Sequence, residues 1–197
     1  MSVDPNTPTQ GGFPVPPGAG GHRRPSAARY VVPALVAAAV AVGLGAYGKA
    51  HDPAGTAFNL AGFSSTSAVK SWLGTGAFAF ALLQVGSALM LYGRLPGPSW
   101  SAGLHRWSGR IAFLVSVPVA VHCLYALGYQ TYSTRVLWHS LLGCFFYGAF
   151  SAKMLLLRSE RLPGPLLPVV AGVVFAALTG IWLTSALWFF RTFGVTA

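Results

Sequence analysis

Two histidines, His122 and His139, lie within consecutive apolar stretches of the sequence. Gly128 is a candidate C-cap for the first of the two helices, and Thr134 is a candidate N-cap for the second. At a rise of about 1.5 Å per residue, both imidazoles then lie roughly 8–9 Å below the same membrane face. Ionisable residues within a bilayer are costly and usually serve a function. Two imidazoles at one depth favour axial ligation of a b-type haem.

The residues around His139 suit such a cofactor. Gly143 follows one helical turn later and leaves room for a flat macrocycle. Arg135 is expected at the outer end of the span, beside the level of the two histidines. There it is a partner for the haem propionates or, alternatively, an anchor for lipid headgroups. Side chains within expected reach of the second ring nitrogens are Tyr125, Ser140 and Thr134.

The same residues also allow other metal chemistry. Copper held by His122, Cys123 and His139 is an alternative, because imidazole and thiolate both suit that metal. His122 and Cys123 are chain neighbours and point about 100° apart on a helix, which makes joint ligation awkward. His105 lies seventeen residues before His122, about 25 Å along a helix and therefore at the opposite face. It marks either an interfacial anchor or a second site for an anion, a quinone headgroup or a second haem.

The composition predicts an all-α integral membrane protein. The chain has 197 residues, of which 54% are hydrophobic and only 8% charged. Five apolar runs approach the ~20 residues that a spanning helix needs. Extended to their expected helix ends, the predicted spans cover residues 31–48, 71–93, 104–128, 135–157 and 166–190.

Spans two to five are expected to form a four-helix bundle with span one at its periphery. The segment Ser87–Pro98 is similar to Ser151–Pro165, which indicates that the helix pair of spans two and three is duplicated as spans four and five. A local explanation is equally available, because Pro and Gly end one helix and begin the next.

The flanks and charges predict the topology. Residues 1–27 are rich in Pro and Gly and are expected to form a disordered cytoplasmic tail, with residues 28–197 as the transmembrane domain. Nine of the thirteen Lys and Arg residues lie at one side of the predicted spans and four at the other. This favours a multi-pass plasma-membrane protein with a cytoplasmic N-terminus and an extracytoplasmic C-terminus. The net charge of +10 is explained by topology and anionic lipid, and no basic and aromatic patch indicates nucleic acid.

The motif from His105 to Arg110, of the form HR-x-x-GR, begins a span with a histidine deeper in it and another in the next span. This arrangement resembles membrane b-type cytochromes of the ferric-reductase-like group. The chain as a whole resembles an uncharacterised family of small actinobacterial membrane proteins. Members of the cytochrome group with two haems carry two histidine pairs, whereas this chain offers one pair and His105, so the resemblance implies a single haem.

The sequence therefore predicts a single-haem electron-transfer protein or subunit. Its acids are Asp4, Asp52 and Glu160, none of them deep in a span, which disfavours a carboxylate proton relay. An electron carrier without a nucleotide-binding motif needs an extracytoplasmic redox protein or a membrane quinone as partner. The alternative is a non-catalytic membrane subunit or assembly factor whose histidines hydrogen-bond helices together. Whether the chain is an enzyme on its own is left open.

Overall fold

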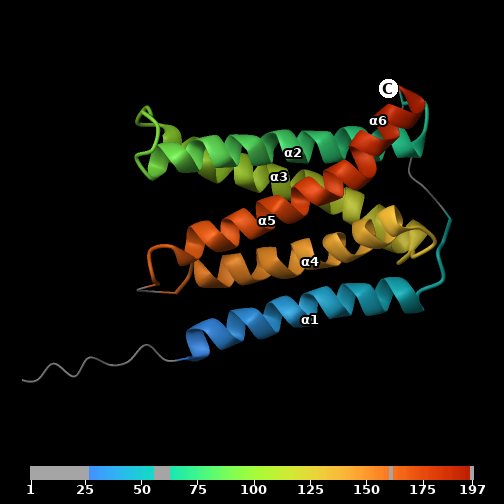
Figure 1. Ribbon diagram of the computed structural model, residues 1–197, viewed down its shortest axis with the longest axis horizontal. Coiled ribbons are helices and arrows are strands. Elements are labelled where there is room, and N and C mark those ends of the chain that lie inside the picture. Colours follow the sequence, from blue (N-terminus) through green and yellow to red (C-terminus); the bar gives the residue numbers. More distant parts are fainter. Residues whose placement is uncertain (1–26, 56–62, 160–161, 196–197) are drawn as a thin grey trace, which may run out of the picture.

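The computed structural model describes residues 27–55, 63–159 and 162–195, and within these ranges it is helical, without a strand. The all-α class is thus confirmed for the described residues. The long helices are α1 (Ala28–Ala50), α2 (Thr66–Leu91), α3 (Ser101–His122), α4 (Thr134–Leu156) and α5 (Leu166–Trp182) (Figure 1). The tail predicted over residues 1–27 lies outside the described residues, except for Ala27.

Two of the helices change from α-helical to π-helical hydrogen bonding near their C-terminal ends. α3 continues into a π-helix, η1 (Cys123–Leu127), and α5 continues through a second π-helix, η2 (Leu183–Leu187), into α6 (Trp188–Phe193). A π-helical turn holds an extra residue and widens the helix locally. Both π-helices lie at the end of the molecule where α1, α3 and α6 end and where α2 and α4 begin (Figure 1). We call this the cavity end.

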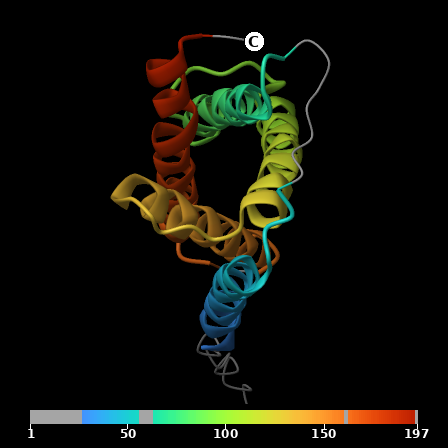
Figure 2. The same ribbon diagram turned by 90° about the vertical axis from the view of Figure 1, so that its right-hand side faces the viewer.

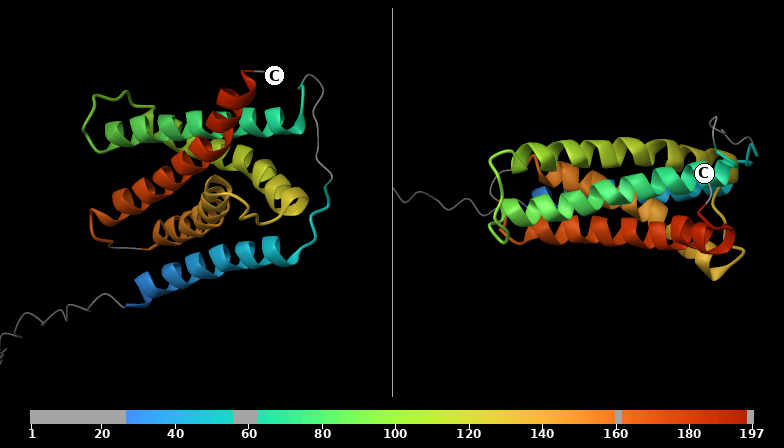
Figure 3. Two further views of the ribbon diagram at one scale, coloured as in Figure 1. Left: turned by 45° about the vertical axis from the view of Figure 1, so that its right-hand side comes forward. Right: turned by 90° about the horizontal axis from the view of Figure 1, so that it is seen from above.

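Helices α2, α3, α4 and α5 surround a central space, and α1 lies outside them against α4 (Figures 2 and 3). α2 packs along α3, and α4 packs along both α1 and α5. Among the described helices, α3 and α4 have no comparably broad backbone contact, so side chains alone bridge the space between them.

Serine residues begin two of the helices. Ser65 accepts a hydrogen bond from the Ala68 backbone N–H at 3.1 Å, and Ser133 accepts one from Val136 at 3.3 Å. The predicted N-cap at Thr134 is therefore wrong by one residue, because Ser133 supplies the oxygen that satisfies a free N–H at the start of α4. The predicted end at Gly128 is confirmed, since its φ of 70° is a conformation that glycine adopts without strain.

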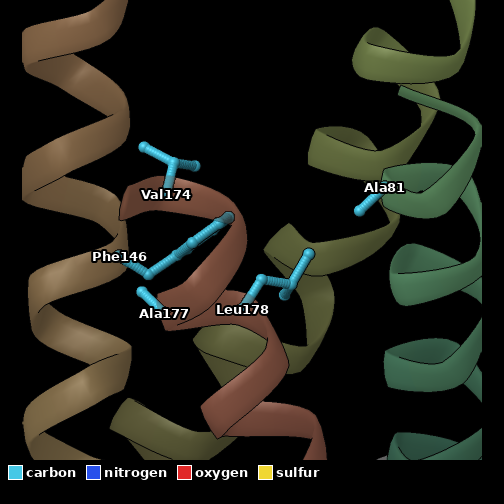
Figure 4. Packing of buried hydrophobic residues seen from close by; sticks show 5 residues of the cluster. All are labelled: Ala81, Phe146, Val174, Ala177 and Leu178. Atoms are coloured by element: carbon cyan, nitrogen blue, oxygen red, sulfur yellow. The ribbon is translucent and has the colours of Figure 1, made fainter. Parts of the chain in front are cut away.

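A small apolar core joins three of the helices near the middle of the bundle. Figure 4 shows its members, which are Ala81 of α2, Phe146 of α4 and Val174, Ala177 and Leu178 of α5. The alanines let the backbones approach closely, and the ring of Phe146 fills the remaining space. This core fixes α5 between α2 and α4.

Four helical segments are long and apolar enough to cross a membrane: Ala28–Ala50, Thr66–Leu91, Ser101–Leu127 and Leu166–Phe193. Large apolar side chains on them, such as Val42 and Leu114, are exposed on the outside of the molecule. These features are compatible with a lipid bilayer. α4 is the one long helix of the described chain outside this set.

Candidate functional site

A cavity of about 690 Å³ lies among α2, α3, α4 and α5, at the cavity end of the bundle. This volume is within the range of small-molecule and cofactor sites, about 300–1,000 Å³. Three of the residues singled out in the sequence, His139, Arg135 and Gly143, line it together. Their common position follows from their spacing, since residues four apart lie on one face of α4.

The two π-helices form part of the cavity wall. Cys123 and Leu127 of η1 and Thr184 and Ser185 of η2 are among the lining residues. π-helical turns are frequent at functional sites because the extra residue redirects neighbouring side chains and backbone groups. The wall is otherwise largely apolar, with Leu178, Ile181 and Trp182 contributed by α5.

The ring of His139 is held from one side by Thr184. His139 Nδ1 lies 3.2 Å from Thr184 Oγ1, and the Thr184 hydroxyl donates to the Gly180 carbonyl at 2.7 Å. A hydroxyl carries a single proton, so Thr184 accepts an Nδ1–H from His139 when its own proton is on the Gly180 carbonyl. In that tautomer Nε2 carries the lone pair, which is the form that ligates a metal.

A layer of aromatic residues closes the cavity towards the middle of the bundle. The Tyr147 hydroxyl and Ser116 Oγ are 3.0 Å apart and link α4 to α3. Below them the rings of Phe113 and Phe150 stack with centroids 4.5 Å apart. Between this layer and His139 lies Gly143, where an added Cβ would meet no heavy atom within 4 Å. The space one turn from His139 is therefore open.

Two cationic side chains, Lys70 and Arg135, line the cavity, and no carboxylate of the described residues does. Arg135 Nη1 donates to the Thr184 carbonyl at 2.6 Å, and its guanidinium lies 3.7 Å from the centroid of the Trp188 ring. Tyr129 also lines the cavity, and burial raises the pKa of its hydroxyl, which keeps it neutral. The charge of the lining favours a ligand that carries negative groups.

His122 lies beside this cavity and not in its lining. Its side chain is 9% exposed, and it makes no hydrogen bond to any residue that the structure describes, while the adjacent Cys123 lines the cavity. His122 is six residues from Ser116, and His139 is eight from Tyr147. Because Ser116 and Tyr147 are in contact, the helix rise places the two histidines within about 3 Å of each other in depth. Their common depth agrees with the prediction, but joint ligation stays a prediction.

His105 lies at the opposite end of the bundle, where it links α3 to α2. Its Nδ1 is 3.0 Å from Ser87 Oγ, and Ser87 donates to the Leu83 carbonyl at 2.7 Å. The Gln84 amide donates to the His105 carbonyl and to Ser108 Oγ. His105 is therefore part of an interhelical hydrogen-bond network well away from the cavity.

In the described part of the chain, no three His, Cys, Asp or Glu side chains gather as a group that could hold a metal ion. Cys123 and Cys144 are free thiols. The copper alternative stays a prediction.

Sequence analysis missed two residues of the site, Thr184 and Lys70. Thr184 is one of only three hydroxyl residues between Leu166 and Phe190, which is the available signal that it satisfies a polar group across a helix interface. Lys70 is one of the four cations counted for topology at this end, and a cation near the start of a span also faces a site at that end. The expected ring partners Tyr125, Ser140 and Thr134 do not hydrogen-bond His139; Ser140 instead donates to the Gln130 carbonyl at 3.0 Å.

Fold and site together define an all-helical protein whose apolar helices surround a cavity with cations and an oriented histidine in its wall. The chain belongs to a family of unknown function (DUF6529), whose model matches residues 30–197 and thus all five long helices. It matches no curated protein and no solved structure. The comparisons supply a family and no activity, so the resemblance to b-type cytochromes stays a prediction.

Proposed function

We propose that this protein is a membrane b-type cytochrome that binds one haem in the cavity and transfers electrons. The observation that carries the proposal is His139, whose Nδ1 is held by Thr184 so that Nε2 is left as a free ligand in a cavity of about 690 Å³. When bound, haem supplies reversible one-electron chemistry at its iron.

The residues present fit this cofactor in three respects. The wall is mostly apolar, as a macrocycle requires, and Gly143 leaves open space one turn from His139. Lys70 and Arg135 provide positive charge for two propionates, because ammonium and guanidinium groups pair with carboxylates. Thr184 supplies the outer hydrogen bond that ligating histidines usually have.

His139 would ligate the iron through Nε2, and His122 is the proposed second ligand, which requires its ring to turn from beside the cavity into it. His122 is buried at a similar depth, and ligation would break no hydrogen bond of its ring to the described residues. His105 is assigned no haem, since its ring is engaged by Ser87 at the other end of α3.

The membrane arrangement that we propose has five spans. α4 is 23 residues long, which at about 1.5 Å per residue exceeds the roughly 30 Å of a hydrocarbon core. It lies along α1 and α5, both apolar enough to cross a membrane. We place the protein in the plasma membrane with the N-terminus cytoplasmic, the cavity end extracytoplasmic, and a quinone or an extracytoplasmic redox protein as electron partner.

The deciding experiment is a visible spectrum of the protein purified in mild detergent after expression with ample haem. We expect a Soret band and sharp reduced α and β bands after dithionite addition, at one haem per chain. His139→Ala should remove the haem, His122→Ala should lose the low-spin spectrum, and His105→Ala is the matched control that keeps both. A full haem complement in the first two variants would overturn the ligand assignment, and a colourless wild-type protein would overturn the proposal.

One set of observations favours a second candidate, a non-catalytic membrane subunit. His139 with Thr184 and His105 with Ser87 both form hydrogen bonds between neighbouring helices, as structural histidines would. Such interhelical bonds contribute about 0.6–2 kcal/mol in a membrane. This candidate predicts a colourless protein in which His139→Ala and His105→Ala lower the melting temperature by similar small amounts.

A further inference from the structure

A second hollow of about 440 Å³ lies on the outside of the bundle, between α1 and the pair α3 and α4. We call it the α1 groove. Val36, Val40 and Leu44 of α1 form one wall, and α4 with the turn after it forms the other, from Tyr147 to Arg158. Phe113 of α3 lies between them. The lining is apolar except for Tyr147, Ser151 and Arg158, and Arg158 is its one charged residue.

The groove exists because α1 approaches α4 on one row of residues only. Ala37 and Ala41 contact Gly148 so closely that a Cβ added there would lie 2.4 Å from the Ala37 carbonyl oxygen. Val36 and Val40 lie in the adjacent row of α1. This row faces Phe113 of α3 across the groove. Since α3 packs on α2, this second row is left facing an open apolar space.

The dimensions of the groove match one lipid acyl chain. On α4 the lining runs from Tyr147 to Leu155, eight residue steps or about 12 Å along a helix, and Arg158 extends it in the turn that follows. One leaflet of a bilayer has a hydrocarbon thickness of about 15 Å, half of the whole core. An acyl chain lying in the groove therefore reaches from the middle of the bundle to the level of its own headgroup.

The positive charge of Arg158 at the end of the groove favours a lipid with an anionic headgroup. Arg158 is exposed where α4 ends, at the arginine-rich end of the molecule that also carries Arg94 and Arg106. The carboxylate of Asp52 follows α1 at the opposite, cavity end, and Glu160, two residues after Arg158 in the sequence, lies outside the described residues. Basic groups between helices at the membrane surface bind anionic headgroups.

We infer that the α1 groove binds one acyl chain of an anionic phospholipid, with the lipid phosphate on Arg158. The apolar rows of α1 and α4 hold the chain, and the guanidinium pairs with the phosphate oxygens in the bidentate manner that its geometry allows. The groove shares Leu44 and Tyr147 with the cavity, but the lipid proposal does not depend on the haem proposal. It stands even if the cavity binds no haem.

The test is native mass spectrometry of the full chain with equal amounts of phosphatidylglycerol and phosphatidylcholine that carry the same acyl chains. We expect about a fivefold preference for bound phosphatidylglycerol, the factor that one arginine contributes near an anionic lipid. Arg158→Ala should bring the ratio close to one. Arg94→Ala, a charge at the same end outside the groove, is the matched control and should leave the ratio unchanged.

A second variant tests the groove itself. Val40→Trp fills the apolar space and should reduce retention of both lipids, with the melting temperature measured on the same sample to show that the chain is folded. Equal binding of the two lipids by the wild-type protein would overturn the proposal, as would an Arg158→Ala variant that keeps its preference. A long-chain isoprenoid quinone that displaces both lipids from wild type and Arg158→Ala alike would assign the groove to quinone instead.

Discussion

The most informative single contact is the one between His139 and Thr184, because it decides which ring nitrogen is free. With its only proton on the Gly180 carbonyl, Thr184 serves His139 as an acceptor. His105 and Ser87 repeat the arrangement at the other end of the molecule. The difference between the two histidines is their surroundings, since His139 borders a cavity and His105 a packed helix pair.

Removing the Thr184 hydroxyl should weaken haem binding through His139. Thr184→Val keeps the shape of the side chain but leaves Nδ1–H without its acceptor, and loss of such an outer partner typically costs 10–100-fold in metal affinity. Thr184→Ser restores the hydroxyl and is the control. Haem titration and the midpoint potential measure the effect, and equal haem affinity in both variants would show that Thr184 does not position the ligand.

A large side chain at Gly143 should exclude the cofactor without unfolding the protein. An added Cβ at Gly143 meets no heavy atom within 4 Å, and the same is true of Gly43 on α1, which is not part of the cavity wall. Gly143→Leu is therefore expected to lose haem while its melting temperature in the haem-free state stays close to that of Gly43→Leu. Haem retained at full stoichiometry in Gly143→Leu would place the cofactor elsewhere.

At the level of elements, the contact of α1 with α4 depends on one glycine. Gly148 admits the backbone of α1 at Ala37, and any side chain there collides with the Ala37 carbonyl. Gly148→Val should destabilise the protein by about 1–3 kcal/mol, the usual range for overpacking, with Gly43→Val as the tolerated control. Thermal unfolding in detergent checks the prediction, and because the α1 groove has α1 as a wall, lipid retention should fall in the same variant.

The helices themselves were predictable, while the π-helices were not. Long apolar runs with terminating Gly and Pro mark each helix to within a few residues, as the bounds of α4 and α5 illustrate. The π-helical turns at Cys123 and Leu183 leave no mark in hydropathy, because they change which residues face inward and not how apolar the segment is.

The site was predictable on α4 and less so elsewhere. His139, Gly143 and Arg135 share one face by helical spacing alone, and all three line the cavity. The position of His122 depends on how α3 is rotated, which is set by its contact with α2. Lys70 and Thr184 come from two further helices, and their approach to the site is a property of the bundle and not of any local pattern.

At the scale of the whole molecule, the arrangement in the membrane depends on whether α4 crosses it. Its neighbours α1 and α5 are apolar enough to span a membrane, and α4 runs beside both over a similar length. It carries His139, Arg135 and Lys153 together with several serines, which lower its mean hydropathy. Arg135, His139 and Ser140 line the cavity, so a functional site on α4 itself accounts for part of the polar content of this helix.

The number of spans determines where the two termini lie, which gives a direct test. With α4 in the membrane the chain crosses five times and its ends are on opposite sides, whereas four crossings return the C-terminus to the side of the N-terminus. The positive charges predict that the N-terminus is cytoplasmic. A C-terminal alkaline phosphatase fusion should therefore be active and a C-terminal green fluorescent protein fusion dark, with the reverse result for fusions truncated after Arg158. A fluorescent full-length fusion would contradict the arrangement of five spans with a cytoplasmic N-terminus.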